Sequence, residues 1–338
     1  MTKLGYIKRM SLDIFRAQNR GGRGIKGMAV LNDDYTTGLQ LTGTKDNMLF
    51  FTNQGRIYLL KAYEIPVASR TSRGTPLINL IQLQPGEKVT AMITGKGMSE
   101  EEAAQRYIVM ATKSGTIKKT PAKEYSNVRK NGLIAITLKE GDELISVKET
   151  AGNEDVLLVA KSGNSIRFNE ESVRICGRSS IGVRGMDLRD GDELVSMEVA
   201  SSDQEILFVS ENGLGKRTYM SEFNPQGRGG KGSRGYKITE KTGGLVGTAT
   251  VTGDDEIMLM TTEGIVIRTV IDSIPILSKT TSGVKLMNID KEGEARVASF
   301  TIIPAAAETE DAGTDEDADD GLTQDASDTP DPSEDENE

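Results

Sequence analysis

Two short segments combine glycine with arginine and lysine in a pattern that could bind phosphate. They read Gln18-Asn-Arg-Gly-Gly-Arg-Gly24 and Gln226-Gly-Arg-Gly-Gly-Lys-Gly232, so both fit Gln-x-Arg-Gly-Gly-[Arg/Lys]-Gly. Glycine lets the backbone turn freely and approach a surface closely. The interleaved basic side chains can donate hydrogen bonds to phosphates without base-specific geometry. We therefore expect both segments, with the nearby Lys26 and Arg234, to contact a nucleic-acid backbone.

Other interpretations of the two segments are weaker. Each contains G-x-G-x-x-G, but neither opens a convincing helix, which a dinucleotide site requires. The phosphate-loop motif is absent, because Lys231 is followed by Gly232. A disordered Arg-Gly linker that binds RNA loosely would suit either segment alone. Two copies within a repeat array favour an ordered loop.

The composition excludes several kinds of chemistry. The chain has no His, no Trp and one cysteine, Cys176, which excludes histidine acid–base catalysis, His-containing metal sites and intrachain disulfides. None of the eight tyrosines can be assigned as a nucleophile from its surroundings. The longest apolar runs are about five residues, and we see no secretory signal. We expect a cytoplasmic chain that is no enzyme by itself and holds no cofactor or metal.

The charge is divided between two parts of the chain. The whole sequence carries a net charge of −10, but residues 308–338 contain 15 acidic residues and no Lys or Arg. The remaining 41 basic and 36 acidic residues give the body a net charge of +5. A segment with the composition of the tail cannot bury a core. We predict a domain over residues 1–305 and a disordered acidic tail over residues 306–338.

The body contains internal repeats of about fifty residues. Apolar runs of three to five residues each lead into a polar turn that ends in glycine, at Gly5, Gly55, Gly115, Gly163, Gly213 and Gly264. The intervals between these glycines are 50, 60, 48, 50 and 51 residues, so the chain has six repeats. The first turn, Thr2–Gly5, lacks its leading strand, so we expect one incompletely paired blade.

The repeats are built from short β-type runs. Asn212-Gly213 predicts a two-residue hairpin turn of type I′, and the apolar run Val156–Ala160 predicts a strand buried on both faces. Fifty residues is about the length of a four-stranded propeller blade. We therefore predict an all-β fold, a six-bladed propeller-like disk.

Further basic residues recur with the repeats. One stands four residues after most of the hairpin glycines, and others accompany glycine elsewhere in the repeats. A recurring cation would form a basic rim that suits a long polyanion bent around the disk. The expected rim residues are Arg9, Arg56, Arg70, Arg73, Lys119, Arg129, Lys130, Arg167, Arg178, Arg184, Lys216, Arg217, Arg268, Lys279 and Lys285.

These repeats and glycine–arginine segments resemble the C-terminal domain of bacterial DNA gyrase A over residues 2–305. The resemblance implies a β-pinwheel, a propeller variant that exchanges strands between blades and wraps duplex DNA around its rim. It identifies the first segment as the family's gyrase box, namely Gln18, Arg20, Gly21, Gly22, Arg23, Gly24 and the adjacent Lys26. The second copy comprises Gln226, Arg228, Gly229, Gly230, Lys231, Gly232 and the adjacent Arg234.

The resemblance also implies partners. The whole enzyme is an A2B2 assembly, in which the N-terminal part of gyrase A cleaves DNA and gyrase B hydrolyses ATP with Mg²⁺. None of those parts lies in this chain, and we expect the isolated domain to be monomeric and nucleoid-associated. The equivalent domain of topoisomerase IV generally lacks the box, so two copies favour gyrase. A protein-binding propeller adaptor or an Arg-Gly RNA-binding protein remains an alternative.

Overall fold

The apolar runs of the repeats form β-hairpins at the centre of antiparallel sheets. In the computed structural model, residues 1–11, 25–26, 34, 40–69, 71–95, 105–289 and 295–305 are described. The five hairpins are β3 (Asn47–Thr52) with β4 (Arg56–Lys61), β7 (Tyr107–Thr112) with β8 (Thr116–Pro121), β11 (Asp155–Ala160) with β12 (Asn164–Asn169), β15 (Glu205–Ser210) with β16 (Leu214–Tyr219), and β19 (Glu256–Thr261) with β20 (Ile265–Val270).

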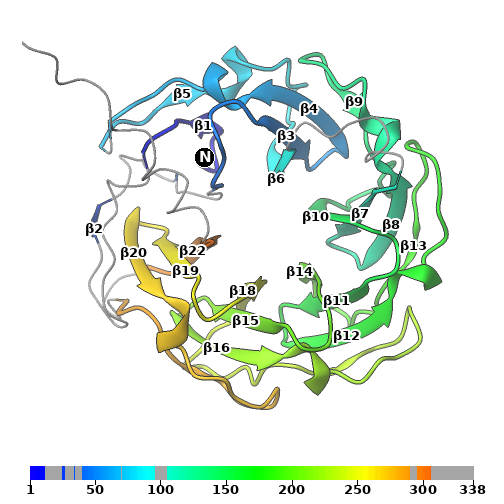
Figure 1. The fold of residues 1–338 in the computed structure, drawn as a ribbon, viewed down its shortest axis with the longest axis vertical. Helices are drawn as coiled ribbons and strands as arrows, with labels where there is room; N and C mark the ends of the chain where they lie inside the picture. The colour runs from blue at the N-terminus through cyan, green and yellow to red at the C-terminus, as the bar shows by residue number, and fades with distance from the viewer. Residues whose placement is uncertain are drawn as a thin grey trace, which may run out of the picture. The chain divides into compact units, whose positions relative to one another are not determined.

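Each hairpin gains an inner strand from its own repeat. These strands are β6 (Val89–Gly95), β10 (Leu144–Thr150), β14 (Leu194–Val199), β18 (Leu245–Val251) and β22 (Val297–Ile303). They lie toward the centre of the ring of sheets that residues 1–304 form (Figure 1). A single 3₁₀ turn follows each hairpin, at Ala62–Glu64, Ala122–Tyr125, Glu170–Ser172, Met220–Glu222 and Ile271–Ser273, and another lies at Leu77–Asn79.

The fourth strand of each sheet comes from the next repeat and lies at the outer edge. Each outer strand has two residues: β9 (Leu133–Ile134), β13 (Val183–Arg184), β17 (Ser233–Arg234) and β21 (Val284–Lys285). The sheet of the last repeat receives β2 (Ile25–Lys26) from the first, with Ile25 opposite Val266. Neighbouring repeats therefore exchange strands around the ring, and the exchange joins the last repeat to the first.

The described residues contain five four-stranded sheets and one two-stranded sheet, so the expectation of a six-bladed disk is corrected to five complete blades in this part of the chain. The first repeat contributes β1 (Tyr6–Ile7), which pairs only with β5 (Thr75–Pro76) of the second repeat in the part of the chain that the structure describes. The architecture is nevertheless all-β and built on the repeats that the turns indicated.

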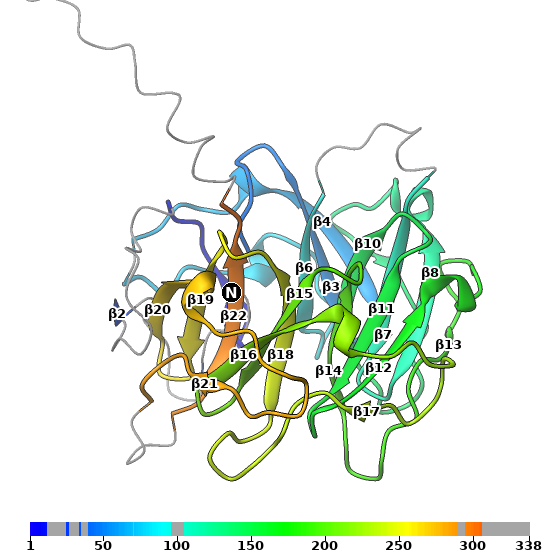
Figure 2. The ribbon, with the colours of Figure 1, turned by 60° about the horizontal axis from the view of Figure 1, so that its bottom comes forward.

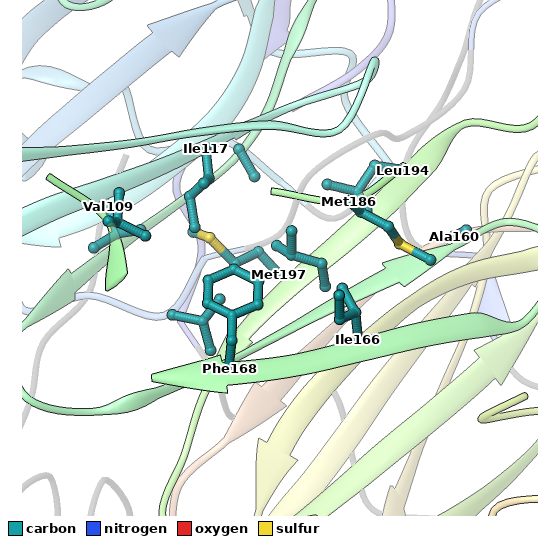
Figure 3. Close-up of a cluster of buried hydrophobic side chains, with 12 residues drawn as sticks. Val109, Ile117, Ala160, Ile166, Phe168, Met186, Leu194 and Met197 are labelled. Carbon is teal, nitrogen blue, oxygen red and sulfur yellow. The ribbon is translucent and has the colours of Figure 1, made fainter. Parts of the chain in front are cut away.

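The hydrophobic core lies between adjacent sheets. Val109 and Ile117 of the third repeat pack against Leu158, Phe168 and other side chains of the fourth, all buried (Figure 3). The turned view shows the β7–β8 and β11–β12 hairpins side by side (Figure 2). Because each hairpin is covered on both faces, all of Val156–Ala160 is inaccessible to solvent, as its apolar run predicted.

The hairpin turns explain the recurring glycines. Gly213 has φ +73° and its N–H donates to the Ser210 carbonyl at 3.0 Å, so three residues connect β15 to β16. The predicted two-residue type I′ turn is therefore wrong, and the connection is the three-residue kind that ends in a left-handed glycine. The other hairpin glycines, including Gly5, repeat this bond.

Residues 12–24 and 306–338 lie outside the described part of the chain, so the first box and the predicted acidic tail carry no structural description. No helix among the described residues is long and apolar enough to cross a membrane.

Candidate nucleic-acid interface

The two-residue outer strands present basic side chains at the edge of the ring. The second residue is Arg184 in β13, Arg234 in β17 and Lys285 in β21, and all three are exposed. Arg184 leaves 70% of its side chain accessible. In β2 the same position is Lys26, whereas β9 carries Ile134 and β5 carries Pro76. Strand exchange thus sets a cation at the same place on successive sheets.

The second glycine–arginine segment is an ordered loop that packs on the preceding repeat. Its end requires glycine, because Gly232 has φ +70° and a Cβ there would lie 2.5 Å from the Ser165 carbonyl oxygen. The Gly229 N–H donates to the Gly185 carbonyl at 2.8 Å, and the Gln226 N–H donates to the Arg167 carbonyl at 2.8 Å. We call residues 225–232 the box loop.

Within the box loop, the two cations differ in role. Arg228 is half-buried, and its guanidinium donates to the carbonyls of Ser172, at 3.1 Å, and Arg184. It therefore fixes the loop to the fourth repeat. Lys231 is exposed, and no ion pair joins it to a described residue. Lys231 and the neighbouring Arg234 are free to meet a phosphate.

The expectation of a solvent-facing rim four residues after each hairpin glycine is wrong for four of the repeats. Lys119, Arg167, Arg217 and Arg268 are only 3–8% exposed. Arg167 Nε donates to Asp155 at 2.8 Å, Arg217 pairs with Glu205 at 2.8 Å, and Arg268 pairs with Glu256. Arg167, Arg217 and Arg268 thus join the two strands of their hairpins, and none of the four side chains forms part of an exposed rim.

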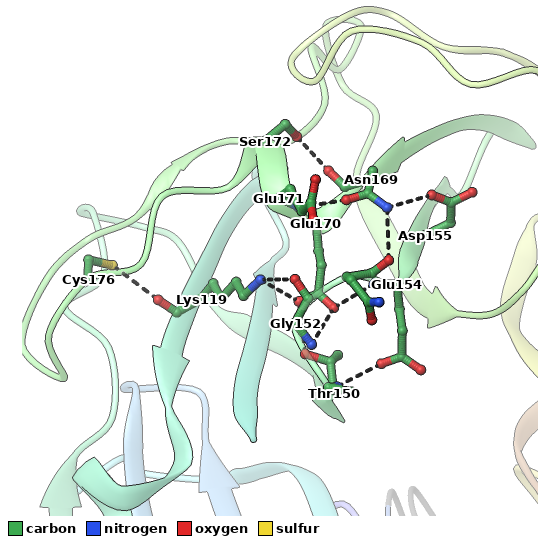
Figure 4. A network of polar contacts seen from close by, with 12 residues as sticks. Lys119, Thr150, Gly152, Glu154, Asp155, Asn169, Glu170, Glu171, Ser172 and Cys176 are labelled. Atoms are coloured by element: carbon green, nitrogen blue, oxygen red, sulfur yellow. Dashed lines mark hydrogen bonds and ion pairs between the residues drawn. The ribbon is translucent and has the colours of Figure 1, made fainter. Parts of the chain in front are cut away.

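Lys119 shows how completely such a cation is enclosed. Its ammonium lies 3.0 Å from the Glu170 carboxylate and donates to the Gly152 carbonyl at 2.8 Å (Figure 4). Glu170, itself buried, also accepts from Thr150 and from the backbone of Gly152 and Glu154. Each charge is therefore paired and hydrogen-bonded, which is the condition for burying it.

A spacing in the sequence indicates these ion pairs. In three repeats an acidic residue precedes the basic one by twelve positions: Asp155 before Arg167, Glu205 before Arg217 and Glu256 before Arg268. An antiparallel hairpin with a three-residue turn brings residues of that separation together. The exposed cations of the outer strands also recur in the sequence, since Arg184, Arg234 and Lys285 are separated by 50 and 51 residues.

The remaining predicted rim residues divide by exposure. Arg73 and Arg129 are exposed, and so is Lys130, which pairs with Glu64 at 2.6 Å, whereas Arg178 is half-buried. Several donate to backbone carbonyls: Arg9 to Ile65, Arg56 to Asn131, Arg178 to Ile134 and Lys279 to Glu222. Lys216 is fully buried.

Some predicted site residues lie outside the described part of the chain, namely Arg70, Gln18, Arg20, Gly21, Gly22, Arg23 and Gly24, together with the side chain of Lys26. Arg174, exposed beside the loop after β12, is a cation that the sequence reasoning missed.

A ring of four-stranded antiparallel sheets, each completed by an outer strand from the next repeat, defines a β-propeller of the pinwheel kind. The family model described as "DNA gyrase C-terminal domain, beta-propeller" matches residues 1–42, 46–95, 106–150, 154–201, 204–252 and 255–303. The six matched segments are the six repeats of the sequence. The chain belongs to this family, which confirms the resemblance seen in the sequence.

Related proteins agree with this assignment. The DNA gyrase A protein of Streptococcus pyogenes serotype M3 is 52% identical over 303 residues, which cover 90% of this chain and 36% of the relative. The DNA gyrase A protein of Clostridium acetobutylicum is 47% identical over 303 residues, with the same coverage. This chain thus spans about a third of the length of these relatives.

Two solved structures share the fold. One described as the DNA gyrase A C-terminal domain has a TM-score of 0.80 and 28% identity, covering 90% of this chain and 98% of its own. The C-terminal domain of DNA topoisomerase IV has a TM-score of 0.69 and 26% identity, covering 92% and 96%.

Proposed function

We propose that this chain binds duplex DNA along the outer strands of its sheets and wraps it, as the C-terminal domain of a DNA gyrase A protein. The observation that carries the proposal is the exposed cation at the second position of β13, β17 and β21. Phosphate contacts of this kind are sequence-independent and position a duplex without reading its bases. Because successive contacts lie on successive sheets around the ring, DNA that follows them must bend.

The box loop adds to this surface. Its close-packed glycines keep the backbone near the fourth repeat, while Lys231 projects from it and Arg234 follows in β17. By the shared pattern, the first box would act in the same way on the sheet that receives β2. We propose that Arg20, Arg23 and Lys26 contribute there.

In the longer protein, this domain would serve a reaction carried out elsewhere. We propose that it delivers wrapped DNA, in the bacterial nucleoid, to an A2B2 assembly whose cleaving and ATP-hydrolysing parts lie outside this chain. It follows that the isolated chain, a monomer, should neither form covalent adducts with DNA nor hydrolyse ATP. No cluster of potential metal ligands occurs among the described residues.

The test uses relaxed closed-circular DNA, a nicking-closing enzyme and this chain. Wrapping traps supercoils that remain after the protein is removed. The double variant Lys231→Ala with Arg234→Ala should retain fewer supercoils. The magnitude of the slope of log K against log salt concentration should fall by about 1.8, because two phosphate contacts are lost. The matched control is Lys139→Ala with Lys241→Ala, which removes two cations from turns before inner strands. Normal DNA binding by the wild-type chain without retained supercoils would contradict wrapping.

A further inference from the structure

The third residue after each hairpin glycine alternates between lysine and a less polar residue. In chain order these residues are Lys8, Tyr58, Lys118, Ile166, Lys216 and Ile267. Lys118 and Lys216 are completely buried, and neither forms an ion pair with a described residue. Burying an unpaired ammonium group is costly. Since two repeats place isoleucine at the same position, the fold itself does not require the lysine.

The buried ammonium groups contact loops that arrive from the next repeat. Lys216 Nζ donates to the Ser278 carbonyl at 2.6 Å, and Lys118 Nζ donates to the Arg178 carbonyl and also, at 2.7 Å, to the Ala135 carbonyl of its own repeat. In the first repeat, Lys8 Nζ donates to Ser69 and Ser72 at 3.0 and 2.9 Å. Each lysine thus reaches a loop that leads into an outer strand.

Two aromatic rings also lie near the Lys216 ammonium. Its Nζ lies 5.7 Å from the ring centroid of Phe208 and 5.4 Å from that of Tyr236. The two rings are stacked on each other, 6.0 Å apart. A cation over aromatic faces is attracted by their quadrupoles, so the rings partly replace the solvation that the ammonium lost.

The box loop occupies the same place on the fourth repeat, but it docks differently. Under it stands Ile166, whose Cδ1 would lie 3.4 Å from a Cβ on Gly230. In both arrangements the loop begins at a residue that forms a β-bridge with the hairpin strand. It ends seven positions later at a glycine with positive φ. Pro225 and Gly232 bound the box loop, and Ile276 and Gly283 bound the loop over Lys216. A glycine-rich loop thus lies on isoleucine in the fourth repeat, whereas in the third and fifth repeats a buried lysine bonds a carbonyl of the corresponding loop.

We infer that Lys118 and Lys216 are positioning residues of the DNA-binding surface, which hold loops 175–182 and 276–283 in place of the glycines of the box loop. This inference rests on the proposed function. A backbone carbonyl bound to a buried ammonium is withdrawn from the outer side, where its partial negative charge would repel phosphate. The loops so held carry Arg178 and Lys279 and lead into the exposed Arg184 and Lys285.

The arrangement makes DNA binding sensitive to pH. Burial lowers the pKa of Lys216 to about 7 and that of Lys118 to about 8. The charged and titratable groups near Lys216 are Glu222 and Tyr236. Those near Lys118 are Cys176, Arg178, Glu124 and Tyr125, which donates to the same Ala135 carbonyl. The chain contains no histidine. Raising the pH removes the ammonium charge, and the bond to the loop carbonyl loses the strength that the charge gives it.

The experiment compares Lys216→Met with the matched control Ile166→Met, which places the same side chain under the box loop. Duplex affinity and amide hydrogen exchange are measured near pH 6 and near pH 8.5. Losing one ordered loop should weaken the affinity of the Lys216 variant about five- to tenfold near pH 6, the effect of about one phosphate contact. Near pH 8.5 the difference from wild type should shrink, and residues 276–283 should exchange faster in the variant at the lower pH.

A second variant separates the hydrogen bond from the charge. Lys216→Gln keeps an N–H donor, so it should restore slow exchange in residues 276–283 but leave a flatter pH profile than wild type. If Lys216→Met does not fold, Lys216→Ile reproduces the residue of the sixth repeat. A folded variant with wild-type affinity, exchange and pH profile overturns the inference alone. Absence of duplex binding by the wild-type chain overturns the proposed function instead.

Discussion

At the scale of single residues, arginine has two different roles in this chain, one in stability and one in the exposed surface. Arg217 is nearly buried and bonded to Glu205, whereas Arg234 is exposed and unpaired among the described residues. A buried guanidinium that loses its partner leaves an uncompensated charge, which costs far more than the loss of a surface cation. The two kinds can be told apart by measuring stability and DNA affinity separately.

We predict that Arg217→Met lowers the free energy of unfolding by about 3 kcal/mol, because the Glu205 carboxylate, whose side chain is only 15% exposed, loses its partner. Urea unfolding measures the change. The control, Arg234→Ala, should alter stability by less than about 0.5 kcal/mol and yet weaken DNA binding. A stability loss for Arg217→Met no larger than that of the control would contradict the role of the ion pair.

Lys216 should also make stability depend on pH. Its pKa is about 7 in the folded chain and near the ordinary 10.5 after unfolding, so between these values the unfolded chain binds more protons. Stability therefore rises with pH from about 7 upward, with a slope approaching about 1.4 kcal/mol per pH unit, and does not change through this group below about pH 6. Urea midpoints across this range should rise less in Lys216→Met than in wild type. Equal slopes of the urea midpoint against pH in the two proteins would contradict this role of Lys216.

At the scale of elements, the hairpin turn is also the joint between repeats. The Gly163 N–H closes the β11–β12 turn on the Ala160 carbonyl, and the Gly163 carbonyl accepts from Gly235 of the next repeat at 2.8 Å. A side chain at Gly163 would meet the Tyr236 carbonyl oxygen at 2.4 Å. Glycine is therefore required here by both backbone conformation and contact.

We predict that Gly163→Ala destabilises the domain more than Gly191→Ala does. Both glycines have positive φ, +84° and +77°, but nothing lies within 4 Å of a Cβ at Gly191. The control should show only the conformational cost of about 1–2 kcal/mol, whereas Gly163→Ala must also displace the fifth repeat. Thermal unfolding of the two variants compares the costs, and equal losses would show that the joint tolerates a methyl group.

At the scale of the whole molecule, the separation of charge carries a prediction from sequence alone. The acidic segment 308–338 carries a charge of −15 beside a body of +5. A tethered anion of this size would compete with DNA phosphate for the basic outer strands. Truncation after Pro304 should therefore tighten duplex binding at low salt, and the gain should shrink as screening increases. Salt titrations of the full and shortened chains provide the measurement. Equal affinities throughout would leave the segment with no role in binding.

The sequence by itself determined the repeat and its local structure. Five of the six turns ending in glycine marked the described hairpins, and the apolar run Val156–Ala160 marked a strand covered on both faces. Turn chemistry and burial depend on residues within a few positions, so they are written in local patterns. The family followed from the same repeats and from the pattern of the two boxes.

Only the tertiary structure decided which cations face solvent. Arg167 and Arg184 both recur with the repeat, yet the first lies in a hairpin beside Asp155 and the second in an outer strand. An outer strand of two residues is too short to show any periodicity, and it pairs with a different repeat. Its place depends on contacts fifty or more residues away, which no local pattern encodes. The buried lysines belong to the same category, since Lys216 acquires its role from Ser278, sixty-two positions along the chain.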